Sequence, residues 1–114
     1  MKKYLFVGEQ RSELAKKMNV TWKDKHLAAA PLYRALKEIG ICWNDCVFLN
    51  VFEDDICDIK SFNGIVIAMG RTVEKELKKH QISHLFIYHP ATRGSVRKTE
   101  NYNNHVKERI GHIV

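Results

Sequence analysis

The chain has 114 residues, which suits one domain over residues 1–114 with its own hydrophobic core. Its formal net charge at pH 7 is +6, from 19 Lys and Arg residues against 13 Asp and Glu residues. A positive excess favours a polyanionic partner such as DNA, although a basic surface that only keeps a protein soluble has the same composition. No apolar run approaches the roughly 20 residues that span a bilayer, so we expect no membrane partner.

The first predicted strand is the apolar run 4–7, which leads into Gly8-Glu9-Gln10-Arg11-Ser12. The polar segment that follows, residues 8–26, has room for one helical turn at Glu13–Met18. Apolar residues spaced three and four apart then predict a helix over residues 27–39, which Gly40 terminates. Pro31 inside this helix marks an alternative first turn, with residues 28–30 extended before it.

The rest of the chain repeats this alternation. Short apolar runs closed by polar residues or glycine predict three further strands, at residues 46–51, 64–69 and 84–88. Amphipathic stretches predict helices at residues 72–80 and 99–110. The connection between the second and third strands has room for at most one helical turn. The predicted order is therefore β-α-β-β-α-β-α.

Helices separate most of the predicted strands, which indicates a parallel sheet whose strands are buried on both faces. We therefore predict an α/β protein, a three-layer α/β/α fold with a four-stranded parallel sheet. Ligands of such sheets bind beyond the carboxyl ends of the strands. Glu9, Asn50, Gly70 and His89 follow the four apolar runs, so we expect these residues to converge at one candidate site.

Three cysteines, Cys42, Cys46 and Cys57, form an odd number without a C-x-x-C pair. This usage is typical of reduced thiols in a cytoplasmic protein, and we expect Cys46 to be buried. The histidines show no zinc-like spacing relative to these cysteines, so we expect no metal. The first eight residues are too short for a signal peptide and lead directly into a strand, which also favours a cytoplasmic location.

Four motifs at the strand ends resemble the uracil-DNA glycosylase superfamily, most closely its bacterial and archaeal iron–sulfur branch. They are Gly8-Glu9-Gln10-Arg11-Ser12, Leu49-Asn50, Ala68-Met69-Gly70-Arg71 and His89-Pro90-Ala91. The likeness covers about residues 4–110. It implies a glycosylase-like fold and a minimal, monomeric enzyme that recognises a base in DNA and cleaves its N-glycosidic bond.

The resemblance also implies a role for single residues of these motifs. Asn50 would read the edge of a flipped base, because an amide both donates and accepts hydrogen bonds. His89 would donate to a base oxygen and stabilise the anion that leaves when the bond breaks. Glu9 or Gln10 would hold the attacking water, and the alternative role of Glu9 would be to oppose the positive charge that develops on the sugar.

Binding roles follow from the same resemblance. Gly8 would lie at the base-binding site, and Trp22 stands in the segment where the family keeps an aromatic under the base. The loop 91–98 would press into the minor groove of the duplex. Arg93, Arg97 and Lys98 would there contact phosphates.

The chain departs from the family pattern at several points. Arg11 and Ser12 stand where the family has Pro and Gly, and Ala91 replaces the serine after His-Pro. Gln10 stands where other branches carry a water-activating Asp or Asn, and an amide is a poor base. The four cysteines that bind the cluster are absent, so we expect no iron–sulfur centre and no other cofactor.

Each candidate residue also has a structural interpretation. Asn50 can cap a turn, His89 can be an ordinary strand-end residue, and Glu9 can be solvated or cap the next helix. Trp22 can belong to the core, and the basic loop can be a solvated surface. Two other functions therefore stay open: an inactive module that binds nucleic acid or nucleotides, and an enzyme of free nucleosides or nucleotides.

Overall fold

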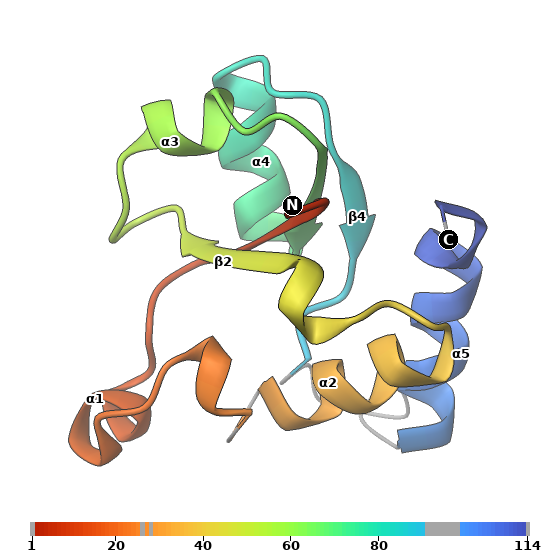
Figure 1. The fold of residues 1–114 in the computed structure, drawn as a ribbon. Helices are drawn as coiled ribbons and strands as arrows, with labels where there is room; N and C mark the ends of the chain where they lie inside the picture. The colour runs from red at the N-terminus through yellow and green to blue at the C-terminus, as the bar shows by residue number, and fades with distance from the viewer. Residues whose placement is uncertain (1, 26, 28, 91–98, 114) are drawn as a thin grey trace.

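The computed structural model describes residues 2–25, 27, 29–90 and 99–113. Its strands are β1 (Tyr4–Gly8), β2 (Cys46–Asn50), β3 (Ile65–Met69) and β4 (Leu85–Ile87). They form one sheet in the order β2-β1-β3-β4, in which every neighbouring pair is parallel (Figure 1). The predicted four-stranded parallel sheet is thereby confirmed.

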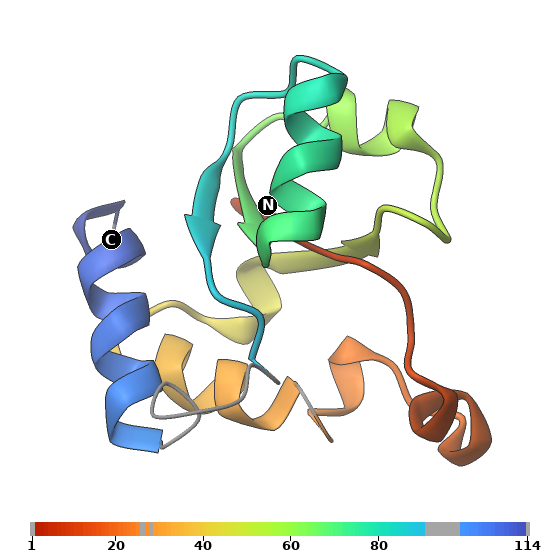
Figure 2. The ribbon, with the colours of Figure 1, turned by 180° about the vertical axis from the view of Figure 1, so that it is seen from behind.

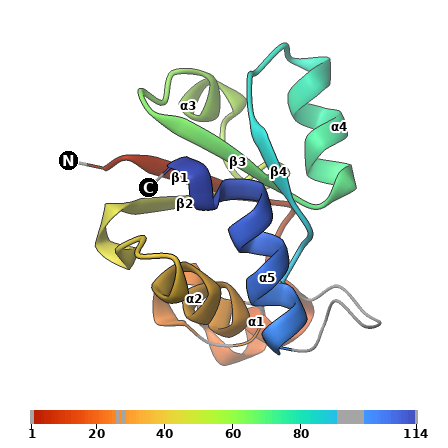
Figure 3. The ribbon, with the colours of Figure 1, turned by 90° about the vertical axis from the view of Figure 1, so that its right-hand side faces the viewer.

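Helices cover both faces of this sheet, which gives three layers (Figure 3). The elements α2 (Ala29–Glu38) and α5 (Thr99–Ile110) pack on one face, and α3 (Ile56–Lys60) and α4 (Arg71–Lys79) pack on the other. Side chains of a strand point alternately to its two faces. Phe6 therefore joins the α2 and α5 core, and its neighbour Leu5 joins the α3 and α4 core.

Several boundaries differ from the predicted ones. The helix α2 begins at Ala29, and Pro31 lies in its first turn, where the missing backbone N–H has no helical partner to lose. Gly40 follows α2 with a φ of 86°, a left-handed conformation that suits glycine. The one helical turn predicted between β2 and β3 is α3.

The prediction that every strand is buried on both faces was wrong for β2. This strand lies at the edge of the sheet, and Val47, Phe48 and Leu49 are only half-buried. The central strand β1, by contrast, is buried along its whole length. A short apolar run indicates a strand, but it does not give the order of the strands in the sheet.

The segment between β1 and α2 lies at one end of the molecule (Figure 2). It contains α1 (Glu13–Met18), which has no buried residue, and the 3-10 helix η1 (Trp22–Asp24). Two further 3-10 helices are η2 (Trp43–Asp45) and η4 (Gly111–Ile113). Within the described residues, no helix is both long and apolar enough to cross a membrane.

The three cysteines are free thiols in the structure. Cys46 is buried at the start of β2, as predicted, whereas Cys42 and Cys57 are exposed. Burial raises the pKa of Cys46 to about 12, so this thiol stays protonated and packs as a small apolar side chain.

Candidate functional site

The carboxyl ends of the four strands lie along one rim of the sheet. Gly8 at the end of β1 pairs in register with Asn50 at the end of β2. On the other side, the Gly70 N–H donates to the Ile87 carbonyl at 2.9 Å. A Cβ atom at Gly70 would lie 3.5 Å from the Cβ atom of His89, so these two residues are neighbours. Residues far apart along the chain therefore meet at this rim.

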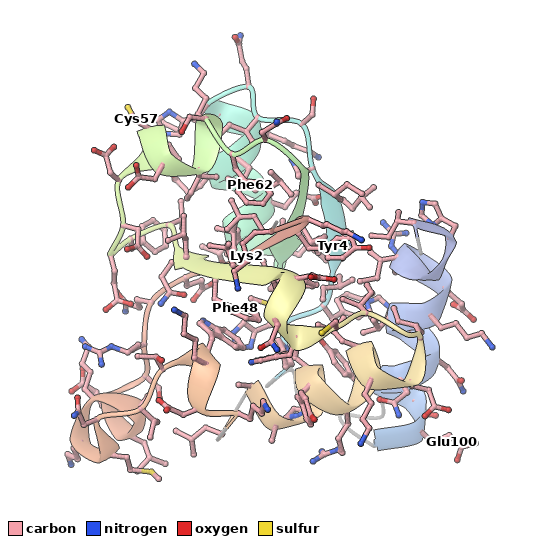
Figure 4. The ribbon with its side chains drawn as sticks, in the orientation of Figure 1. Lys2, Tyr4, Phe48, Cys57, Phe62 and Glu100 are labelled. Atoms are coloured by element: carbon pink, nitrogen blue, oxygen red, sulfur yellow. The ribbon has the colours of Figure 1, made fainter. Side chains whose placement is uncertain are left out.

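Trp22 lies over the rim between Asn50 and His89. Its indole Nε1–H donates to Asn50 Oδ1 at 3.2 Å, and its ring stacks on Phe48 with the ring centroids 5.9 Å apart. Figure 4 shows Phe48 on the side of β2 that faces η1. The ring of His89 approaches the indole edge-on, at a centroid distance of 6.1 Å. A hydrogen bond of 2.7 Å from the Thr21 N–H to the Asp24 carboxylate fixes this 3-10 turn and hence the indole.

Trp22 is in the lining of two cavities, together with Arg11 and Thr21. The first, which we call the His89 cavity, has a volume of about 220 Å³ and includes Gln10, Arg11, Leu14, Trp22, Leu27 and His89 in its lining. The second, which we call the Asn50 cavity, has a volume of about 440 Å³ and includes Arg11, Trp22, Phe48, Asn50, Glu53 and Asp54 in its lining. Among the described residues that line the His89 cavity there is no carboxylate.

His89 is a neutral imidazole at pH 7. Burial lowers its pKa below the ordinary histidine value, and the negative charge of Glu9 partly opposes this shift. Glu9 is therefore within electrostatic range of His89, where it would also stabilise a positive charge next to the ring. Glu9 is half-buried and Gln10 is exposed at the wall of the His89 cavity.

The residue Asn50 is only 8 % exposed, and both ends of its side-chain amide are hydrogen-bonded inside the protein. Its Oδ1 atom accepts from Trp22, and its Nδ2 donates to Glu53 Oε1 at 2.8 Å. The same Glu53 oxygen accepts the Arg11 backbone N–H at 2.8 Å. Glu53 therefore links the loop after β1 to the loop after β2 through the amide of Asn50.

The predicted site residues fall into three groups. Gly8, Glu9, Trp22, Asn50 and His89 lie together at the rim, although Asn50 and His89 face different cavities. Gln10 lies at the wall of the His89 cavity. The residues predicted to contact phosphates, Arg93, Arg97 and Lys98, lie outside the described residues.

Sequence reasoning missed three members of the site. The ring of Phe48 stacks on that of Trp22, and Glu53 accepts a hydrogen bond from the Asn50 amide. Arg11 lines both cavities. Glu53 stands three residues after Asn50, which is the spacing of a turn, and that signal was available in the sequence. Nothing in the sequence pairs Phe48 with Trp22, because the irregular segment that carries Trp22 has no periodicity.

No protein-family model, curated protein or solved structure matches this chain. In the part of the chain that the structure describes, no three His, Cys, Asp or Glu side chains gather closely enough to hold a metal ion. The assignment of a function to this site therefore rests on its geometry and on the strand-end motifs.

Proposed function

We propose that this protein binds a nucleic-acid base in the His89 cavity and cleaves its N-glycosidic bond, acting as a cytoplasmic monomer on DNA. The observation that carries the proposal is an indole and a neutral imidazole lining one largely apolar cavity at the carboxyl ends of parallel strands. A flat base can stack on Trp22 while its polar edge reaches His89. The resemblance of the strand-end motifs to the uracil-DNA glycosylase superfamily supports the same assignment.

The reaction adds water across the bond between sugar and base. The water oxygen bonds to the anomeric carbon, the bond to the base nitrogen breaks with its electron pair on the base, and the base ends with the proton from water. A neutral His89 can donate its ring N–H to a base oxygen as negative charge develops there. Glu9 faces the positive charge that forms on the sugar, and Gln10 can orient the water.

The charge distribution favours approach of a polyanion from the side of the His89 cavity. Arg11 lines both cavities, and its Nε lies 3.9 Å from Glu53 Oε2. The described lining of the His89 cavity has no acidic residue, whereas that of the Asn50 cavity includes Glu53 and Asp54 beside Lys23. The chain as a whole carries a formal charge of +6. Binding to DNA should therefore release counterions and weaken steeply as the salt concentration rises.

A second candidate function, a binding module without catalysis, is favoured by the state of Asn50. The amide that would read the base edge already donates to Glu53 and accepts from Trp22. Contact between Asn50 and a base would require the indole to give up its hydrogen bond, because Trp22 lies between the two cavities. A protein that only binds a base against Trp22 and His89 needs no such exchange.

Base release from a duplex oligonucleotide that contains one deoxyuridine tests the proposal, with oligonucleotides that carry other deaminated or methylated bases beside it. We expect His89→Ala to lower the rate of base release by about 10²–10³, the effect of removing one donor to a developing anion. His112→Ala is the matched control, because this histidine is exposed on η4.

The outcome separates the two candidates. Base release that depends on His89 supports the enzyme. Salt-dependent binding without product at any protein concentration overturns the enzyme and supports the binding module. Binding that does not respond to salt overturns both, because each requires contact with a polyanion.

A further inference from the structure

The strand β4, which ends two residues before His89, lies at the edge of the sheet, and among the described residues no strand pairs with its outer side. In β4, alternate residues turn their backbone N–H and C=O groups away from the sheet. Ile87 faces inward, because its carbonyl accepts the Gly70 N–H. Phe86 and Tyr88 on either side of it therefore present their backbone groups outward.

Side chains of α5 bind these outward groups. The Arg109 Nε donates to the Phe86 carbonyl at 3.1 Å, and the Tyr102 hydroxyl donates to the Tyr88 carbonyl at 2.9 Å. The Tyr88 N–H donates to His105 Nε2 at 2.9 Å. Spacings of three and four place these side chains on one face of the helix. The helix α5 therefore binds three of these four outward groups, the carbonyls of Phe86 and Tyr88 and the N–H of Tyr88.

The two contacts at Tyr88 fix the backbone one residue before His89. Its N–H is held by His105 and its C=O by Tyr102, and the ring of Tyr88 stacks on that of His105 at a centroid distance of 4.4 Å. The C=O of Tyr88 belongs to the peptide unit that it shares with His89. The contacts from α5 to Tyr88 therefore determine the orientation of the backbone from which the His89 side chain reaches its cavity.

We propose that His105 is a positioning residue for His89, and that it holds the end of β4 only while its Nε2 atom carries no proton. The importance of this position rests on the proposed function of the His89 cavity, whereas the coupling between the two histidines does not. Loss of a proton acceptor at Nε2 would free the Tyr88 N–H and let the start of the His89 segment move.

The protonation state of His105 decides whether its Nε2 atom can accept the hydrogen bond from the Tyr88 N–H. A neutral ring accepts a hydrogen bond at one nitrogen, whereas an imidazolium donates from both and would turn an N–H toward the N–H of Tyr88. Burial and the positive charge of Arg109 lower the pKa of His105, and Glu108 opposes them. Among the described residues, the rings of Tyr88 and Tyr102 also face His105. The bond to Tyr88 is therefore intact at neutral pH and is lost in acid.

Two substitutions distinguish the contribution of the His105 hydrogen-bond acceptor from that of its ring. His105→Gln keeps an acceptor oxygen near the position of Nε2 but cannot take up a proton in this range. His105→Phe keeps a ring that can stack on Tyr88 but has no acceptor. Backbone amide signals of Tyr88 and ring signals of His89, followed by NMR between pH 5 and pH 8 in the full chain, report the coupling without any ligand.

We expect the amide of Tyr88 in the wild-type protein to shift and lose exchange protection as His105 takes up its proton. His105→Phe should exchange this amide about tenfold faster at pH 7.5, as for the loss of one hydrogen bond, and should displace the His89 ring signals. His105→Gln should restore both and remove the pH dependence of the Tyr88 amide. Binding of the deoxyuridine duplex should follow the same order of variants.

The result that overturns the inference is a His89 ring environment in His105→Phe that equals the wild-type one. If that variant does not fold, a Tyr88 amide that ignores the titration of His105 in the wild-type protein overturns it equally. Failure of the proposed function has a different signature, since the NMR coupling would persist while no variant bound or cleaved the duplex.

Discussion

The His89 cavity and the Asn50 cavity have Arg11, Thr21 and Trp22 in common, and we call the Trp22 indole their shared wall. The polar groups of the two cavities nevertheless differ in their interactions. In the Asn50 cavity the amide is bound on both sides, to Trp22 and Glu53, and a second carboxylate, Asp54, accepts the Asn50 backbone N–H at 2.7 Å. In the His89 cavity the polar residues of the described lining are His89, whose imidazole is neutral, and Gln10, Arg11, Ser12 and Thr21. The Asn50 amide therefore helps to hold two loops together, whereas the His89 cavity is where we propose that the ligand binds.

The ends of β2 and β4 lie at the same rim, but Asn50 and His89 are held there by different contacts. Asn50 pairs with Gly8 and builds the support of the indole, whereas His89 follows an edge strand that is held from a helix. Under the proposed function, the Asn50 amide would therefore affect the ligand through Trp22, and the His89 imidazole would contact it directly. Substitutions at the shared wall should affect both cavities, and substitutions on one side should affect one.

Removal of the shared wall should have the largest effect. Trp22→Ala merges the two cavities and removes the surface on which a base stacks, so we expect binding of the deoxyuridine duplex to weaken about tenfold to a hundredfold. Trp22→Phe is the matched control, because it keeps a ring against Phe48 and loses only the hydrogen bond to Asn50, at a cost of about 1 kcal/mol in unfolding free energy. Fluorescence anisotropy and urea unfolding measure the two quantities. Equal affinities of the alanine variant and the wild type would contradict this role of Trp22.

A methyl group added at Gly8, next to Asn50 and Trp22, should have the next largest effect. A Cβ atom at Gly8 would lie 2.7 Å from Asn50 Oδ1 and 3.2 Å from Trp22 Cζ2, so Gly8→Ala must displace the pair. We expect a loss of about 1–3 kcal/mol in unfolding free energy, the usual cost of overpacking. Gly111→Ala is the control, because the nearest atom to its Cβ would be Lys107 Cγ at 3.4 Å, on a flexible side chain. Similar unfolding free energies of the two variants would contradict close packing of Gly8 against Asn50 and Trp22.

A smaller effect, confined to the side of His89, should appear when the pH is lowered. The pKa values of His89 and His105 are both lowered by burial, so the unfolded chain binds these protons more readily than the folded one. Stability should be full above the unfolded histidine pKa of about 6.5 and should fall as the pH drops through the folded values. Urea unfolding between pH 4.5 and pH 8 measures this slope. His89→Gln combined with His105→Gln should flatten it, and an unchanged slope would assign the loss to other groups.

The sequence was informative where the signal is local. Short apolar runs located β1 to β4, and the alternation with helices indicated a parallel sheet. Because parallel strands end at the same side of a sheet, the meeting of Gly8, Asn50 and His89 at one rim followed from the fold class alone. Gly40 was also identified from its own residue type, since a positive φ favours glycine.

What the sequence left open depends on contacts between distant segments. The bond between Trp22 and Asn50 joins residues 28 positions apart, and the bond between Tyr88 and His105 joins residues 17 positions apart. The periodicity of α5 identified its apolar residues, but the polar face that binds β4 has no pattern of its own. For the same reason the sequence predicted Asn50, His89 and Trp22 at one base, but it did not show that the indole is hydrogen-bonded to Asn50.

The smallest effect should come from the charge of the Asn50 cavity. Asp54→Asn keeps an oxygen that can accept the Asn50 backbone N–H and removes a negative charge near the indole. We expect the duplex to bind about twofold more tightly at low salt, since exposed charges contribute on the order of 0.5 kcal/mol, and the gain should vanish at high salt. Asp58→Asn is the matched control, because this exposed carboxylate belongs to α3 on the other face of the sheet. An equal gain from both variants would show that the duplex senses only the net charge, and a gain confined to Asp54 would show that its phosphates pass close to the shared wall.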